Sequence, residues 1–233
     1  MNKKIVITLF SALSIFSFSL KSQVNDFGMW NTFDFEYKFN TKFSVVATEE
    51  FRLKENLSKI NLFYTNLGVS YVINEHFKIS PVFRFIQKGF DDGTFGMRYR
   101  LMLDASYKNK FGIIAFSTRT RLQGELPFPG TDRLGYVPEY YWRQKFDFKF
   151  DINSSRFTPY IGCETRVQFV NPRIKEHPGF GYDRLRSFIG CDYEINAKST
   201  AGIYFLNQMD FQVNNPTTLF ILGLEYSITL GAQ

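Results

Sequence analysis

The chain has 233 residues, a formal net charge of +6 and 18 % aromatic residues, with 28 Phe against 2 Trp. Lys3, Lys4 and Lys21 lie in an N-terminal segment with the features of a secretion signal, so the rest of the chain carries +3 (6 − 3). So small an excess does not indicate nucleic-acid binding. Two cysteines are too few for a disulfide-stapled domain and lack the spacing of a zinc site.

Residues 1–22 are predicted to be a cleavable signal peptide. A basic start is followed by an apolar stretch from Ile5 to Phe18, and the small residue Ser22 precedes Gln23. The alternative is a short anchor helix, for which the apolar stretch is short. We expect one domain over 23–233, because no linker-like stretch divides it. No later segment reaches about 18 apolar residues, which excludes a helical membrane protein.

The mature chain alternates between apolar and polar residues. From Phe95 the odd positions are apolar, and from Pro138 the even positions are, each over about 14 residues, a period that excludes a helix. Similar alternation predicts strands at 30–39, 42–54, 59–73, 76–88, 95–108, 111–123, 138–152, 157–169, 183–195, 199–213 and 217–230. Such lengths exceed the usual five or six residues and suit a tilted bilayer crossing. A soluble sandwich or lipocalin-like barrel also alternates.

The predicted fold is therefore all-β, a single antiparallel up-and-down transmembrane barrel of 10 to 12 strands. Eleven strands place the start of the first strand, near Trp30, at the opposite end of the barrel from the C-terminus. Bacterial barrels normally have even strand counts. Either residues 23–29 belong to a further strand or cross the lumen, or one predicted strand is wrong.

An aromatic residue followed by a tight, Asn-centred turn recurs along the chain and predicts hairpin tips. The aromatic residues before the turns are Tyr37, Tyr71, Tyr107, Phe150 and Tyr193. They share the apolar phase, and we expect a girdle at a lipid–water interface, where an aromatic ring and a Tyr hydroxyl are both favoured. The other connections are longer, which is the outer-membrane pattern with short turns on the periplasmic side.

The polar phase carries nearly balanced acids and bases. The first interpretation is that these side chains fill and brace a narrow lumen, because buried charges persist only when paired. The second is a basic stripe that favours an anion, as a small pore or as a site for an acidic ligand. Pairing of the hairpin around Asn109 would bring this stripe together: Arg98, Arg100, Arg119, Arg121, Arg143 and Lys145.

Few residues suggest catalysis, and we expect no catalytic, cofactor or metal site. His76 lies in a predicted short turn, and His177 lies in a long loop with Asp183 nearby and Asp132 in another loop, an arrangement that leaves a surface acid–base site as a remote alternative.

Two details of the apolar phase stay open. Cys163 and Cys191 lie on adjacent predicted strands, where they form either a cross-strand disulfide or two free thiols facing lipid. Glu49 is a charge in the apolar phase, placed either near an interface or inward by a bulge.

The chain resembles a family of Gram-negative outer-membrane β-barrels catalogued as domain of unknown function 2490. The resemblance rests on the order of short motifs: Asp26-Phe27-Gly28-Met29-Trp30, Glu49-Glu50-Phe51-Arg52, Phe83-Arg84-Phe85, Arg119-Thr120-Arg121, Thr158-Pro159-Tyr160, Arg184-Leu185-Arg186 and Ile221 to Tyr226. The resemblance implies an outer-membrane barrel and assigns no functional role to any residue of this chain. One departure is the C-terminus, Leu230-Gly231-Ala232-Gln233, which lacks the final aromatic residue common in such barrels.

The expected function is that of a narrow or plugged outer-membrane barrel with a structural or partner-binding role. The alternative is a small anion-preferring pore or an uptake barrel for an acidic ligand. The expected partners are membrane lipid, the barrel-insertion machinery during assembly, and a small anionic solute or a protein.

Overall fold

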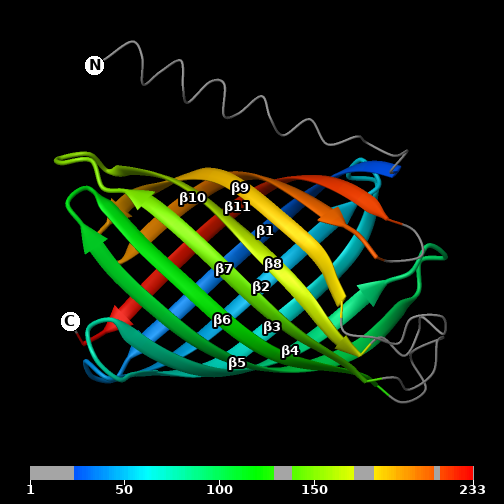
Figure 1. Ribbon diagram of the computed structural model, residues 1–233, viewed down its shortest axis with the longest axis horizontal. Helices are drawn as coiled ribbons and strands as arrows, with labels where there is room; N and C mark the ends of the chain where they lie inside the picture. The colour runs from blue at the N-terminus through cyan, green and yellow to red at the C-terminus, as the bar shows by residue number, and fades with distance from the viewer. Residues whose placement is uncertain (1–23, 129–137, 171–180, 213–215, 233) are drawn as a thin grey trace, which may run out of the picture.

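The computed structural model describes residues 24–128, 138–170, 181–212 and 216–232. These residues form eleven strands, and no helix among them has the length and apolar character needed to cross a bilayer. The strands are β1 (Val24–Lys38), β2 (Phe43–Lys54), β3 (Lys59–Val72), β4 (Phe77–Gly89), β5 (Phe95–Phe111), β6 (Ile114–Pro127), β7 (Glu139–Phe150), β8 (Phe157–Val170), β9 (Gly181–Asn196), β10 (Ser199–Asp210) and β11 (Thr217–Gly231). They close into one strongly tilted barrel, which confirms the predicted fold class (Figure 1).

The barrel closes through one parallel pair. Each strand pairs antiparallel with the next, whereas β1 runs parallel to β11, from Val24 opposite Thr217 to Lys38 opposite Gly231. An odd up-and-down series has its first and last strands in the same direction, so a parallel seam is the only way to close it. Residues 24–29 extend β1 along this seam, so they neither form a further strand nor cross the lumen.

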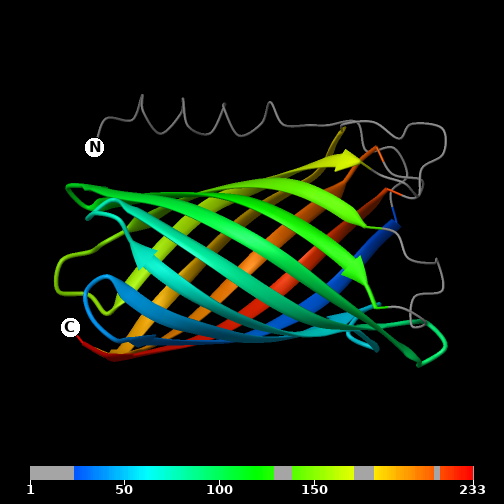
Figure 2. The same cartoon turned by 90° about the horizontal axis from the view of Figure 1, so that it is seen from below.

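The two ends of the barrel differ in their connections (Figure 2). At one end, which we call the short-turn end, the turns are brief, and at the other, the long-loop end, β6 and β7 are separated by residues 128–138 and β8 and β9 by 171–180. The predicted Asn-centred turns are confirmed at three tips. Asn40 Oδ1 accepts backbone hydrogen bonds from Lys42 and Phe43, both at 2.8 Å, and Asn74 and Asn196 accept equivalent bonds.

The turn predicted at Asn109 is wrong. Asn109 lies within β5, opposite Phe116, and the chain reverses at Gly112 and Ile113. Gly112 has φ of +60°, a conformation that a two-residue hairpin loop needs and glycine adopts without strain. This displacement changes the register of the whole β5–β6 hairpin.

The barrel is apolar outside and charged inside. Large apolar side chains cover the outer surface, with Leu67 and Leu101 58 % exposed and Ile189 60 % exposed, whereas many buried side chains are polar or charged. A soluble protein has the opposite arrangement. Strands of 12 to 17 residues, tilted as Figure 1 shows, are long enough to cross the hydrocarbon core. The outer face therefore has the character of a lipid-facing surface.

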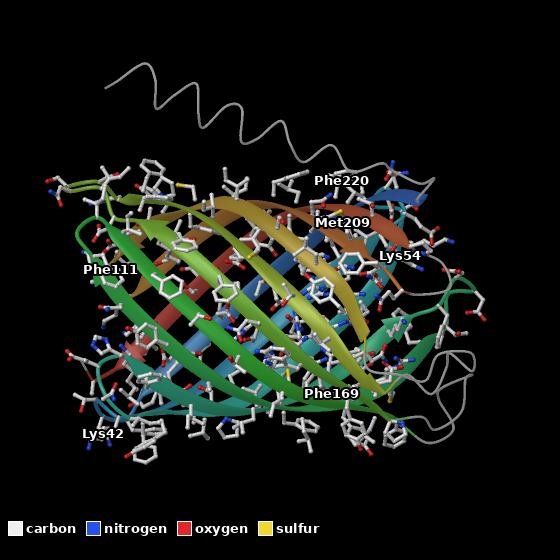
Figure 3. All side chains as sticks on the ribbon, in the orientation of Figure 1. Lys42, Lys54, Phe111, Phe169, Met209 and Phe220 are labelled. Carbon is white, nitrogen blue, oxygen red and sulfur yellow. The ribbon has the colours of Figure 1, made fainter. Side chains whose placement is uncertain are left out.

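The five girdle aromatics all lie near the short-turn end. Three of them pair across neighbouring strands with the aromatic residue that follows a turn: Tyr71 with Phe43, Tyr107 with Phe77 and Tyr193 with Phe157, at ring-centroid distances of 4.8, 5.0 and 4.8 Å. Tyr37 lies opposite Leu230 and Phe150 lies opposite Ile114. In Figure 3, Lys42 and Phe111 mark this end, and Lys54 and Met209 mark the other.

Glu49 faces outward in the middle of β2. It lies opposite Phe33 and Thr65 in an unshifted register, so no bulge turns it inward. Its carboxylate accepts a hydrogen bond from Thr65 Oγ1 at 3.0 Å. This bond partly compensates a charge placed among apolar neighbours.

Candidate functional site

Charged and aromatic side chains from nearly every strand meet halfway along the lumen. We call this set the mid-barrel layer. None of its members is more than 8 % exposed: Trp30, Glu50, Tyr64, Arg84, Asp104, Arg121, Glu164, Arg186 and Tyr204. They come from nine strands, all but β7 and β11. The side chains of an eight-stranded barrel just fill its interior, and the interior widens with strand number, so eleven strands enclose a moderately wider space.

A stacked series of guanidinium groups and aromatic rings runs through the layer. Arg84 lies 3.5 Å from the centroid of the Tyr64 ring, and Arg52 lies 5.5 Å from Tyr64 and 3.5 Å from Trp30. Arg186 also lies near the Trp30 ring, 5.1 Å from its centroid. The series joins β4 to β9 through β3, β2 and β1, so it reaches past β10 and β11. Each contact is a cation–π interaction, which is stronger where water is excluded.

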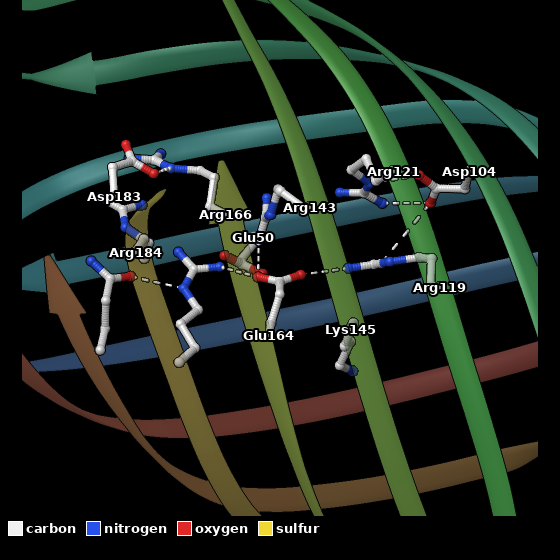
Figure 4. Close-up of polar contacts among 12 residues, drawn as sticks. Glu50, Asp104, Arg119, Arg121, Arg143, Lys145, Glu164, Arg166, Asp183 and Arg184 are labelled. Carbon is white, nitrogen blue, oxygen red and sulfur yellow. Dashed lines mark hydrogen bonds and ion pairs between the residues drawn. The ribbon is translucent and has the colours of Figure 1, made fainter. Parts of the chain in front are cut away.

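Glu164 joins the other side of the layer (Figure 4). Its carboxylate accepts hydrogen bonds from Arg119 at 2.9 Å and Arg186 at 3.0 Å, and also pairs with Arg143. Asp104 accepts both hydrogen bonds of Arg121, each at 2.6 Å. One carboxylate thus holds three guanidinium groups from three strands and offsets part of their charge.

Between this layer and the long-loop end, several charged side chains form ion pairs. Arg98 and Arg100 both bind Glu125, and two further pairs have nearly parallel double hydrogen bonds: Arg166 with Asp183 at 2.9 and 2.7 Å, and Arg184 with Asp210 at 2.5 and 2.8 Å. Asp183 is 3 % exposed and Gln208 is also 3 % exposed. Several polar side chains of this half are therefore paired within the protein and shielded from solvent.

The lumen between the mid-barrel layer and the short-turn end is hollow. A cavity of about 400 Å³ begins at Trp30, Glu164 and Arg186 and extends to Lys149 and Asp192. The exposed fraction of basic side chains rises along it, from 11 % for Arg143 to 33 % for Lys145 and 46 % for Lys149. Solvent therefore reaches this half of the lumen from the short-turn end.

Charge is unevenly distributed around the cavity. The only charged side chains that β4 and β6 contribute to its lining are the cations Arg84, Arg119 and Arg121, whereas the only ones from β1 and β11 are the carboxylates of Asp34 and Glu225. In the ring order, β6 and β11 lie on opposite sides. The field between these walls orients a dipolar molecule across the lumen.

The structure divides the predicted basic stripe. Arg119 lies beside Lys145, and Arg121 lies beside Arg143, as the pattern suggested. Arg98 and Arg100 do not join them, because the turn at Gly112 places Arg100 opposite Glu125. Glu125 is four residues from Arg121, which corresponds to about 13 Å along β6. The predicted stripe did not include Arg84, which lines the same cavity as Arg119 and Arg121.

Of the two arrangements left open for the cysteines, the structure excludes the cross-strand disulfide. Cys163 lies opposite Ser187, and Cys191 lies opposite Pro159. An offset of four residues along paired strands separates their Cα atoms by about 13 Å, and a disulfide needs less than about 7 Å. Both cysteines are free.

The remote catalytic arrangement has little support among the described residues. His177 and Asp132 lie outside them, and Asp183 faces the lumen with its carboxylate bound to Arg166. The described part of the chain holds no cluster of His, Cys, Asp or Glu with the geometry of a metal site.

A family model described as "Protein of unknown function (DUF2490)" matches residues 27–218. The chain belongs to this family. The family suggested by the sequence resemblance is thereby confirmed, and the match runs from β1 to the start of β11. Among solved structures, the chain is similar to one titled "NanC porin structure in rhombohedral crystal form", at 12 % identity, over 77 % of this chain and 86 % of that chain, with a TM-score of 0.46. No curated protein sequence matches the chain.

Proposed function

We propose that the protein is an outer-membrane barrel whose lumen is closed at the mid-barrel layer, with a structural or partner-binding role instead of free diffusion of solutes. The barrel-insertion machinery would assemble it with its short turns in the periplasm, as the outer-membrane pattern requires. Its cavity then opens toward the periplasm, and the paired half of the lumen faces the cell exterior.

The stacked series carries this proposal. Arg186 on β9 contacts Trp30 on β1, and Trp30 contacts Arg52 on β2, so the ring of Trp30 contacts guanidinium groups from two other strands. Trp30 is 6 % exposed and packs against Tyr160, Tyr204 and other members of an apolar cluster in the lumen. No small displacement of one side chain opens such a layer, because neighbours on several strands hold each member.

Conductance across planar lipid bilayers tests the proposal. The wild-type protein is expected to give no steady ion current. Trp30→Ala removes the ring that contacts Arg52 and Arg186, and we expect it to produce discrete current steps. Trp142→Ala is the matched control, because Trp142 is 37 % exposed on the outer face and its loss leaves the layer intact.

The second candidate function is a small anion-preferring pore, favoured by Arg84, Arg119 and Arg121 along one wall of the cavity. For this function, the bilayer conductance experiment is expected to give the opposite result. Steady, anion-selective current through the wild-type protein would support the pore and contradict a closed lumen.

A further inference from the structure

The cavity holds two groups of opposite charge that lack a counter-ion. Arg84 is buried, with 6 % of its surface exposed. Among the described residues, no carboxylate oxygen lies within 4.0 Å of its guanidinium nitrogens. Its Nε donates to Asn66 Oδ1 at 2.6 Å, and its plane lies over Tyr64. These two contacts fix the guanidinium group and leave its terminal nitrogens available to a ligand in the cavity.

Glu225 is the counterpart of Arg84 on the other side of the lumen. Within the described part of the chain, no cation lies within 4.0 Å of its carboxylate and no hydrogen bond to it is found, while its backbone pairs with Gly202 and Thr32. Asp34, on the same wall, accepts a hydrogen bond only from Thr48 Oγ1, at 2.6 Å. Charges that are partly buried in this way are costly unless something pairs with them.

Gly202 forms a recess in the acidic wall. It lies between Asp192 and Glu225 in the sheet, and a Cβ atom added to it would be 2.9 Å from Asp192 Oδ1 and 3.7 Å from Glu225 Oε2. The glycine therefore leaves open a position that two carboxylates flank. An ammonium group placed there would reach both oxygens at or near hydrogen-bond distance.

We propose that the cavity binds a small zwitterionic solute of amino-acid or dipeptide size. Its carboxylate would bind Arg84, and its ammonium group would bind over Gly202 between Asp192 and Glu225. The volume of about 400 Å³ lies within the range of small-molecule sites. The near balance of charges in the lining, eight bases (Arg52, Arg84, Arg119, Arg121, Arg143, Lys145, Lys149 and Arg186) against six acids (Asp34, Glu50, Asp147, Glu164, Asp192 and Glu225), suits a zwitterion better than a plain anion. This site goes beyond the closed barrel and does not depend on whether the lumen conducts.

The test uses dialanine and two neutralised derivatives. Trp30 lines the cavity, and the second Trp of the chain, Trp142, is replaced by Phe, so that fluorescence reports on the cavity alone. We expect dialanine to change this fluorescence saturably and to bind about tenfold or more tightly than N-acetyl-dialanine or dialanine amide. Equal affinity for the three compounds, tighter binding of either derivative, or no binding would overturn the proposal.

Two substitutions separate the two ends of the ligand. In Arg84→Gln, we expect dialanine to lose its advantage over the amide, and in Glu225→Gln its advantage over the acetyl derivative. Replacing both members of the pair Arg184 and Asp210, by Gln and Asn, is the control, because that pair lies outside the cavity lining. Heat-modifiable gel mobility confirms that each variant is folded. Unchanged preferences in both single variants would refute the assignment of the two groups.

Discussion

The two halves of the lumen use the same residue types in different ways. Toward the long-loop end, Arg166 and Arg184 each have a dedicated carboxylate. Toward the short-turn end, Lys145 and Lys149 are increasingly exposed, and Arg84 and Glu225 line a cavity without a counter-ion of their own. The difference shows that the net charge of the lumen does not reveal whether its individual charges are paired. What matters is which charges are paired within the protein and which are left for a ligand or water.

The largest expected effect comes from the boundary between the halves. Glu164→Gln leaves three guanidinium groups without their common carboxylate, so we expect a loss of about 3–5 kcal/mol in the free energy of unfolding. Urea unfolding of the barrel in lipid vesicles measures it. The control is Glu75→Gln, whose side chain is 84 % exposed in a short turn. A Glu164→Gln protein as stable as the control would show that the mid-barrel layer is not held by this carboxylate.

A smaller effect is expected within the paired half. Asp183→Asn leaves the charge of Arg166 without its partner and should reduce stability by about 2 kcal/mol. Replacing both residues by Leu removes the unpaired charge as well, so most of the loss should be recovered. Urea unfolding in lipid vesicles measures the stability of both variants. If the double variant is less stable than Asp183→Asn, the pair contributes more to the free energy of unfolding than the neutralisation of its two charges.

The smallest effect is expected in the hollow half. Lys149 pairs with Asp192 at 2.5 Å, but its side chain is 46 % exposed. Lys149→Gln should therefore change the free energy of unfolding by less than about 0.5 kcal/mol, since water screens exposed pairs. A loss as large as that of Asp183→Asn would mean that the two halves do not differ in this way.

Much of the fold followed from the sequence because alternation is a local property. The eleven strand positions depend on periods of two within each segment, and most bounds agree with the structure to within three residues at either end. The parallel seam was harder to foresee, because nothing in β1 or β11 alone distinguishes a parallel partner. It follows only from the odd count.

The site was less predictable because it depends on register. The inward phase identified which residues face the lumen, but one misplaced turn, at Asn109 instead of Gly112, moved Arg98 and Arg100 away from Arg119 and Arg121. The pairing of the cysteines failed for the same reason, since it assumed a symmetric hairpin between β8 and β9. The isolation of Arg84 and Glu225 depends on contacts across the barrel, which sequence spacing does not contain.

Accessibility of lumen positions to a membrane-impermeant thiol reagent tests the central claim most directly. Single cysteines at Asp147, in the hollow half, and at Gln168, which is 5 % exposed in the paired half, are introduced after Cys163 and Cys191 are replaced by Ser. With the barrel in lipid vesicles and the reagent at the short-turn end, we expect the cysteine at 147 to react readily and the cysteine at 168 to be protected. Equal reaction at both positions would contradict a lumen closed at the mid-barrel layer.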